Sequence, residues 1–264
     1  IEMPNAPEAH KFVREAVQAF PELYFSRLVV LGEGDSEEIV LPRILKTKGA
    51  PVDELAISVV PLGGRHVNHF WRLLTVLNIP FITLLDLDLA RHQGGWGRVR
   101  YVANQLKTYS PEAPFPSIGK IDEIPKWDDD DWKLLEVEDS PKYISYLKEL
   151  EGMSVFFSSP LDIDFAMLKS FPAAYDLDKA DEVLPDESKI KAVLGDSSHG
   201  VEQYVDAEKK LFISYHKRFK LSSKPDAHIN ALSKLTDAEL LAGMPASLGR
   251  LADAVIAKLA ELPE

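Results

Sequence analysis

Acidic residues follow apolar segments at two places in the first third of the sequence. The first apolar segment runs into a Gly-Glu-Gly turn that carries Glu33, and Glu37 comes one helical turn further on. The second, residues 79–85, ends in Asp86-Leu-Asp88. Side chains alternate faces along a strand, so these two aspartates point the same way. Four carboxylates are therefore expected at the ends of strands.

Carboxylates that lie close together repel one another, and a divalent cation readily neutralises such a cluster in a folded protein. Carboxylate oxygens are hard ligands, which favours Mg²⁺ or Mn²⁺. The glycines on both sides of Glu33 allow positive φ and a close backbone approach, so the turn can meet a phosphate without a β-carbon in the way. These residues indicate metal-dependent phosphate chemistry.

Apolar segments that alternate with helical patterns must position these acids. The expected strands are 27–31, 56–60, 80–85 and 153–157, and the expected helices are 7–19, 35–48, 65–77, 98–109, 141–151 and 163–170. Such alternation predicts a parallel sheet with helices on both faces, which binds ligands outside the carboxyl ends of its strands. Asp35 and Glu38 fit a capping box at the start of the second helix, which leaves Glu37 as the functional candidate of that turn.

The order of these features resembles the Toprim (topoisomerase-primase) domain, in which a strand and Glu33-Gly34 precede a helix, a strand and a second glycine turn. Here that turn is Gly63-Gly64, and a further helix and strand lead to Asp86-x-Asp88. The sequence GEGDSEE at 32–38, followed by Leu41-Pro42, is most similar to the nuclease half of the overcoming-lysogenization-defect (OLD) family. The resemblance covers about residues 20–170 and implies an α/β fold with a Toprim-type, mostly parallel sheet flanked by helices.

The resemblance also implies roles for the acids. It makes Glu33 a metal ligand or an acid or base, and it matches Asp162-Ile-Asp164 with a family motif that typically reads Asp-Leu-Glu. Asp162 also fits an N-cap for helix 163–170. The acids expected to hold two Mg²⁺ or Mn²⁺ ions are Glu33, Glu37, Asp86, Asp88, Asp162 and Asp164.

Four basic residues are candidates for contacts with phosphate. Lys224 falls where the family resemblance has a basic residue, and a cation there would stabilise charge that builds on the phosphate during cleavage; it could equally be a surface lysine. Arg91 and His92 lie in a glycine-rich, basic loop, and Arg65 follows the second glycine turn. These three are expected to bind nucleic acid if the sheet edge is the site, and to be solvated surface if it is not.

Residues 1–175 are expected to form the Toprim catalytic domain, with an irregular insertion at about 110–140 that is rich in prolines and acids. From about residue 200 the pattern is helical, with helices expected at 201–218, 225–241 and 246–262. Residues 176–264 are therefore expected to form an appended helical subdomain.

Composition excludes several classes of site. The 264 residues include no cysteine, so disulfides, zinc-thiolate sites and cysteine nucleophiles are excluded, and the histidines lack a zinc-like spacing. The apolar stretches are too short to cross a bilayer and no signal peptide is visible, so we expect a cytoplasmic protein without a membrane partner. The net charge of −12 argues against a generally basic surface for nucleic acid, although metal ions would cancel part of it.

The chain begins with Ile1 and contains no phosphate-binding loop of the GxxxxGK[ST] type, which indicates a fragment of a longer protein. OLD proteins typically join an amino-terminal ABC-type ATPase to the Toprim nuclease. The resemblance thus implies that the missing half is the ATPase and that the partner is DNA.

The favoured function is a metal-dependent DNA endonuclease or nickase that hydrolyses phosphodiester bonds by a two-metal mechanism. A haloacid-dehalogenase-like phosphatase, with Asp86 as nucleophile and Asp88 as acid, remains open, as does a non-catalytic Toprim module that binds DNA or protein. A primase would need a nucleotide-binding channel. A topoisomerase would need a nucleophilic tyrosine, for which the candidates are Tyr101, Tyr109, Tyr143 and Tyr175.

Overall fold

The computed structural model describes residues 20–62, 67–109, 124–128, 141–219 and 223–263. The helix expected at 7–19, the Gly63-Gly64 turn and most of the insertion at 110–140 lie outside these residues. Within them, no helix is both long enough and apolar enough to span a membrane.

Four parallel strands form one sheet in the order β2-β1-β3-β4. Their bounds are Leu28–Gly32 for β1, Ile57–Pro61 for β2, Phe81–Asp86 for β3 and Val155–Ser158 for β4. All residues of β1 and β4 are buried, as expected for strands covered on both faces. The predicted α/β fold with a parallel, Toprim-type sheet is confirmed.

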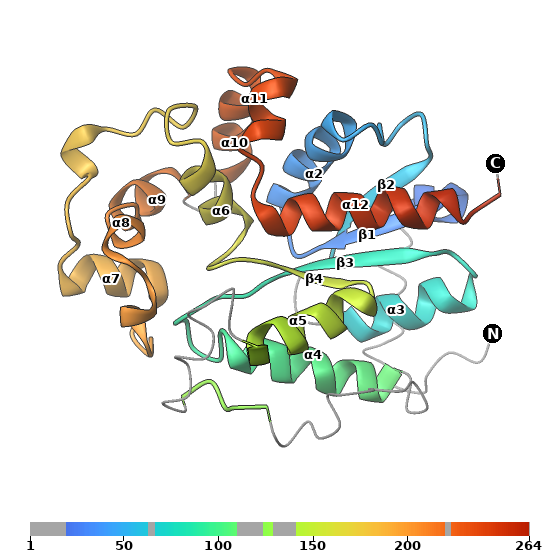
Figure 1. Cartoon of the computed structure of the whole chain (residues 1–264), viewed down its shortest axis with the longest axis horizontal. Helices are drawn as coiled ribbons and strands as arrows, with labels where there is room; N and C mark the ends of the chain where they lie inside the picture. Colours follow the sequence, from blue (N-terminus) through green and yellow to red (C-terminus); the bar gives the residue numbers. More distant parts are fainter. Residues whose placement is uncertain (1–19, 63–66, 110–123, 129–140, 220–222, 264) are drawn as a thin grey trace.

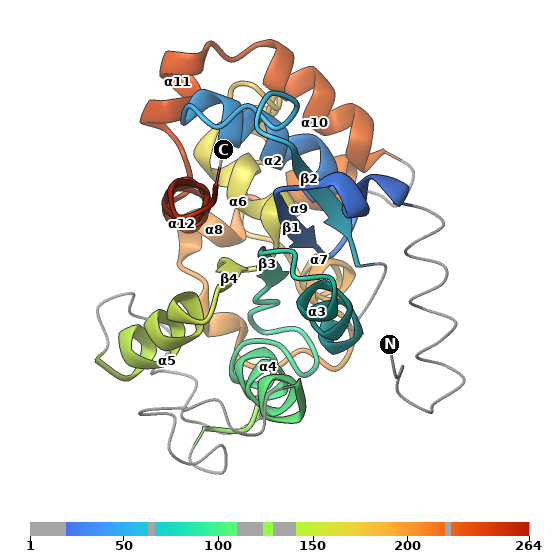
Figure 2. The ribbon, with the colours of Figure 1, turned by 90° about the vertical axis from the view of Figure 1, so that its right-hand side faces the viewer.

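Helices cover both faces of this sheet. The helices α2 (Asp35–Thr47) and α12 (Ala246–Ala260) lie on one face, and α3 (Val67–Val76), α4 (Trp96–Tyr109) and α5 (Pro141–Gly152) lie on the other (Figures 1 and 2). The chain passes from β2 over β1 to reach β3, so the strand order reverses between β1 and β3. Parallel sheets bind ligands at such a reversal point, outside the carboxyl ends of the strands.

Helices from the second half of the chain lie beyond those carboxyl ends (Figure 1). They are α6 (Ile163–Ser170), α7 (Glu187–Leu194), α8 (Asp206–Lys209) and α9 (Phe212–Arg218). Two further helices, α10 (Lys224–Ser233) and α11 (Asp237–Ala242), pack against α2. Short 3-10 helices occupy Pro21–Phe25, Lys179–Asp181 and Val201–Gln203.

The C-terminal part is helical as predicted, but two of the predicted helices are interrupted. In place of a helix at 225–241, the Thr236 side chain accepts a hydrogen bond from the Glu239 amide and starts a new helix. In place of a helix at 201–218, extended residues at Tyr204 and Val205 separate the 3-10 turn from α8. The last helix, α12, packs on β3 and β4, so it covers the sheet of the predicted catalytic domain. The boundary near residue 175 stays a prediction.

Candidate functional site

All six predicted acids lie at the carboxyl edge of the sheet. Glu33 follows β1, Asp86 ends β3, and Asp162 begins the helix after β4. Asp86 is at the centre of the cluster, because its carboxylate is repelled by four of the other acids, namely Glu33, Glu37, Asp88 and Asp162. The charge of Asp164 acts on Glu37. The cluster therefore surrounds the point between β1 and β3 where the strand order reverses.

Asp86 and Glu37 are the acids of the cluster whose pKa values are raised most. Burial, followed by repulsion from neighbouring carboxylates, raises the pKa of Asp86 well above its ordinary value. Burial likewise raises the pKa of Glu37 to about 8, although the amide of Gly34 donates to Glu37 Oε2 at 2.9 Å. The Ser158 hydroxyl donates to Asp86 Oδ1 at 2.7 Å. Within the described residues neither carboxylate forms an ion pair. No paired cation therefore compensates the negative charge that either side chain would carry when ionised.

Arg98 forms ion pairs with two of the acids, Glu33 and Asp88. Its Nη2 lies 2.7 Å from Glu33 Oε2 and 3.1 Å from Asp88 Oδ2, and its Nε donates to the backbone carbonyl of Asp86 at 3.0 Å. The Asp86 amide in turn donates to Glu33 Oε1 at 3.0 Å. The sequence analysis did not assign Arg98 to the site. The available signal was its four-residue spacing with Val102 and Leu106, which places it on the buried face of α4.

Arg91 also turns toward the acids. Its Nη1 lies 2.8 Å from Asp88 Oδ1 and 3.4 Å from Asp162 Oδ2, while its Nη2 donates to the Tyr215 hydroxyl at 3.0 Å. The predicted role of Arg91 in nucleic-acid binding stays a prediction, and its charge is engaged within the protein. His92 is exposed at the rim, with its ring centroid 4.6 Å from that of Trp127. Arg65 lies outside the described residues.

Asp162 is the N-cap of α6, which is one of the two roles predicted for it, the other being metal binding. Its Oδ1 accepts from the Phe165 amide at 2.9 Å, and the Tyr215 hydroxyl donates to its Oδ2. Burial, together with the charge of Asp164, outweighs the effect of Arg91 and raises the pKa of Asp162 to about 6. The cap does not use Oδ2, which faces the cations and the cluster.

Asp164 lies between a lysine and a histidine. Lys224 Nζ lies 2.6 Å from Oδ2, and His228 Nε2 lies 2.8 Å from Oδ1. Burial alone would raise the pKa of Asp164, but the His228 hydrogen bond and the Lys224 charge outweigh it and lower the pKa to about 2. The structure thus places Lys224 at the edge of the cluster, which is where a lysine that contacts the phosphate would have to lie. His228, to which no role was assigned, belongs to this group.

The predicted capping box of Asp35 and Glu38 is wrong. The helix α2 begins one position earlier in the capping pattern, with Gly34 as N-cap and Glu37 as the residue whose carboxylate accepts from the Gly34 amide. Glu37 therefore caps the helix and faces the cluster at the same time. The φ of Gly34 is −158°, so this glycine does not use the positive φ that its type allows.

Gly32 is required for a different reason, which is the close approach of Glu37. A β-carbon at position 32 would lie 2.4 Å from Glu37 Cβ and 2.6 Å from Glu37 Cγ. Because β1 is a central, fully buried strand, its backbone has no room to move away. Gly32 therefore allows the Glu37 side chain to pack directly on the end of β1.

The donor set suits a hard divalent cation. Among the described residues, the six acids face three basic side chains, Arg91, Arg98 and Lys224, so the acids outnumber the cations. In the same residues no three acidic or histidine side chains converge tightly enough to hold a metal ion. Arg98 and Arg91 lie between the acids and explain this spacing. A bound cation would neutralise Asp86 and Glu37 and draw Glu33 toward them.

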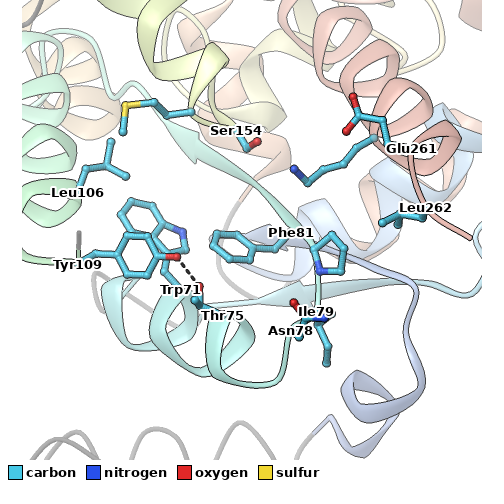
Figure 3. A pocket seen from close by; sticks show the side chains of 13 residues that line it. Trp71, Thr75, Asn78, Ile79, Phe81, Leu106, Tyr109, Ser154, Glu261 and Leu262 are labelled. Carbon is cyan, nitrogen blue, oxygen red and sulfur yellow. Dashed lines mark hydrogen bonds between the residues drawn. The ribbon is translucent and has the colours of Figure 1, made fainter. Parts of the chain in front are cut away.

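A separate cavity lies at the opposite end of the sheet. It has a volume of about 480 Å³ and is lined by the start of β3 at Phe81, by Trp71 and Tyr109, and by Glu261 near the C-terminus (Figure 3). The acids follow the carboxyl ends of the same strands. This cavity is therefore not part of the candidate site.

Without metal, the protein is expected to lose stability as the pH rises from about 5 to 8. The folded pKa of Glu37, about 8, lies above its ordinary value of 4.5, so the folded state keeps a proton that the unfolded chain releases. This contribution to the free energy of unfolding is complete below pH 4.5 and is lost as the pH approaches 8. Asp86 shifts in the same direction.

Thermal unfolding in EDTA across this range measures the effect, with Glu37→Gln as the variant that should flatten the slope. Asp164 does not interfere, because its lowered pKa affects stability only as the pH falls from about 4 toward 2. Saturating Mn²⁺ is expected to offset the loss, since it binds the ionised carboxylates of the folded state. A melting temperature that rises with pH in EDTA would contradict this prediction.

Comparisons with known proteins support the fold. Residues 24–88 match the family described as overcoming lysogenization defect protein-like, TOPRIM domain. The C-terminal region of the Xanthomonas campestris pv. campestris OLD protein is similar in structure, with a TM-score of 0.51 and 19% identity, over 91% of this chain and 99% of that chain. The C-terminal region of the Burkholderia pseudomallei OLD protein has a TM-score of 0.54 and 16% identity, over 89% and 99%. No curated protein sequence matches this chain.

Proposed function

We propose that this chain, whose residues 24–88 match the OLD-like Toprim family, is a divalent-metal-dependent nuclease that cleaves DNA by hydrolysis of phosphodiester bonds. One observation supports this proposal above the others. Asp86 and Glu37 are buried carboxylates at the reversal point of a parallel sheet, and burial and mutual repulsion raise the pKa of both. Structural carboxylates in such a place would be expected to have a cationic partner.

Glu33, Glu37 and Asp86 form the centre of the proposed site for two Mg²⁺ or Mn²⁺ ions, with Asp88 and Asp162 beside them. When bound, these ions lower the pKa of water and neutralise the charge of the phosphate. Ser158 orients the Asp86 carboxylate through its hydroxyl. Glu33, one fifth exposed, is the acid most able to reach a proton on a bound water.

Lys224 and Arg91 supply positive charge at the rim. The Lys224 side chain is partly exposed. Desolvation lowers the pKa of Lys224, but the charge of Asp164 and of the other acids outweighs this effect and raises the pKa, so the ammonium stays charged. A cation in this position would stabilise the charge that builds on the phosphate during cleavage. We propose DNA as the polymer that these cations meet, although the overall charge of −12 argues against a generally basic surface.

We also propose that an ABC-type ATPase domain accompanies this region in the full-length protein. The two solved structures compared above are themselves described as C-terminal regions of OLD proteins.

The test is incubation of supercoiled plasmid with the chain in EDTA, Mg²⁺ or Mn²⁺, with Glu33→Gln and Asp226→Asn as variants. We expect nicking only with metal, lost in Glu33→Gln and retained in Asp226→Asn, because Asp226 is an exposed acid on α10 outside the cluster. Failure of the wild-type chain to cleave in either metal would contradict the proposal.

A non-catalytic Toprim module that binds DNA or protein is the second candidate. It is favoured by the absence, within the described residues, of three ligands already gathered around one point. Such a module would bind DNA equally well in EDTA and Mn²⁺. The phosphatase alternative has less support, because Asp88 is paired with Arg91 and Arg98 and is poorly placed to act as an acid.

Removing Arg98 is expected to make folding depend on metal. Arg98→Met leaves Glu33 and Asp88 without their buried cation, which should lower the free energy of unfolding in EDTA by about 3–5 kcal/mol. Mn²⁺ should recover part of this loss by taking over the charge. Denaturant unfolding measures both effects, and Arg72→Met, which loses only an exposed hydrogen bond to Thr108, is the control. Equal losses in the two variants would contradict this role of Arg98.

A further inference from the structure

Lys224 and His228 lie four residues apart on α10, so their side chains share one face of the helix. Both contact the same carboxylate. Lys224 Nζ is 2.6 Å from Asp164 Oδ2, and His228 Nε2 is 2.8 Å from Asp164 Oδ1. Each oxygen of Asp164 thus has its own partner. Lys224 is partly exposed at the rim, and His228 is fully buried.

His228 is held from its other side by Tyr175, whose hydroxyl is 2.7 Å from His228 Nδ1. Burial raises the pKa of Tyr175, so its hydroxyl stays protonated and can donate. A neutral imidazole with its proton on Nε2 satisfies both contacts, since Nδ1 accepts from Tyr175 while Nε2 donates to Asp164. Hydrogen bonds therefore join Tyr175 to His228 and His228 to Asp164, and the other oxygen of Asp164 forms an ion pair with Lys224.

Aromatic rings pack around the imidazole, whose orientation is set by its two hydrogen bonds. The ring centroid of His228 lies 5.2 Å from that of Phe219 and 5.8 Å from that of Tyr175. His228 has no exposed surface. A buried ring with both nitrogens bonded and neighbouring rings in contact has one orientation available, so it can hold a carboxylate in place.

We propose that His228 is a positioning residue, which fixes the Asp164 carboxylate so that Asp164 holds the Lys224 ammonium at the edge of the acid cluster. This inference rests on the proposed function, in which Lys224 meets the phosphate. It assigns Asp164 to the placement of the lysine, because one of its oxygens is hydrogen-bonded to His228 and the other forms an ion pair with Lys224.

The test compares His228→Leu, His228→Gln and Phe219→Leu in the whole chain. Glutamine can return a donor near the position of Nε2, whereas leucine cannot. Phe219→Leu disturbs the packing around His228 without removing a hydrogen bond to Asp164. Two readouts are used: steady-state cleavage of plasmid with Mn²⁺, and the rate at which an acylating reagent modifies Lys224, followed by mass spectrometry. Acylation needs the neutral amine, which the ion pair with Asp164 disfavours.

In His228→Leu we expect kcat to fall about tenfold or more with little change in KM, the scale typical of groups that orient a functional side chain. Acylation of Lys224 should become severalfold faster. His228→Gln should restore most of both values, and Phe219→Leu should leave both near wild type even where its melting temperature falls.

Unchanged acylation of Lys224 in His228→Leu would overturn the positioning role. So would unchanged kcat in that variant while Asp86→Asn is inactive, or losses in Phe219→Leu equal to those in His228→Leu. A wild-type chain that cleaves no DNA with either metal would instead overturn the proposed function. The acylation readout, which needs no cleavage, separates the two failures.

Discussion

Replacing Asp86 by asparagine is expected to abolish metal-dependent DNA cleavage and, in EDTA, to stabilise the protein. Asp86 lies at the centre of the acid cluster, where four other carboxylates repel it. Asparagine has nearly the same shape and keeps an oxygen for the Ser158 hydroxyl, but it removes the repulsion. We expect the free energy of unfolding at pH 7 to rise.

The loss of cleavage should be about a hundredfold or more, because an amide neither attracts a divalent cation as a carboxylate does nor replaces its charge. Opposite changes in activity and stability are typical of a group kept for function. Plasmid nicking and thermal unfolding measure the two effects, with Asp226→Asn as the control that should alter neither. A variant that is less stable in EDTA and still cleaves DNA would contradict the account of this cluster.

Replacing Gly32 by alanine is expected to damage the site through a single methyl group. The added β-carbon would lie 2.4 Å from Glu37 Cβ, on a central strand that cannot shift. Glu37 must then move, which breaks its hydrogen bond from the Gly34 amide and takes its carboxylate away from Asp86. We expect a loss of about 1–3 kcal/mol in the free energy of unfolding, as is usual for overpacking, and weaker binding of Mn²⁺.

Gly152→Ala is the matched control, because the space around Gly152 at the end of α5 is open within 4 Å. It should change the free energy of unfolding by no more than about 0.5 kcal/mol. Denaturant unfolding and Mn²⁺ titration of both variants provide the measurement. If Gly32→Ala bound Mn²⁺ as tightly as Gly152→Ala does, the proposed place of Glu37 in the site would be wrong.

The sheet and the gathering of the acids could be predicted from the sequence because both follow from local patterns. Apolar segments alternating with helical patterns predict parallel strands, and parallel strands bring their carboxyl ends to one edge. Glu33 and Asp86 therefore had to meet, although they are far apart in the chain. The start of α2 was predicted one residue out, because Asp35 and Glu38 fit the same capping pattern as Gly34 and Glu37.

The side chains that bind the acids through hydrogen bonds could not be predicted in the same way. His228 reaches Asp164 across 64 residues, and Tyr215 reaches Asp162 across 53, through a packing of helices that no periodic pattern encodes. In the sequence Arg98 directly follows the glycine-rich loop of Arg91 and His92. The glycines of that loop suggest an open surface, so the sequence did not predict that Arg98 is buried. In the structure Gly94 instead lets the loop fold back, since a β-carbon there would lie 1.7 Å from the Asp88 carbonyl oxygen.

A calorimetric titration of Mn²⁺ into the wild-type chain and Asp86→Asn tests the central claim most directly. At pH 7 we predict saturable binding of up to two ions by the wild type, with protons released to the buffer, because the raised pKa values of Glu37 and Asp86 leave protons for the metal to displace. Asp86→Asn should bind much more weakly, and Asp226→Asn as the wild type does. Equal binding by all three chains, or no saturable binding by any of them, would contradict the assignment of this acid cluster as a metal centre.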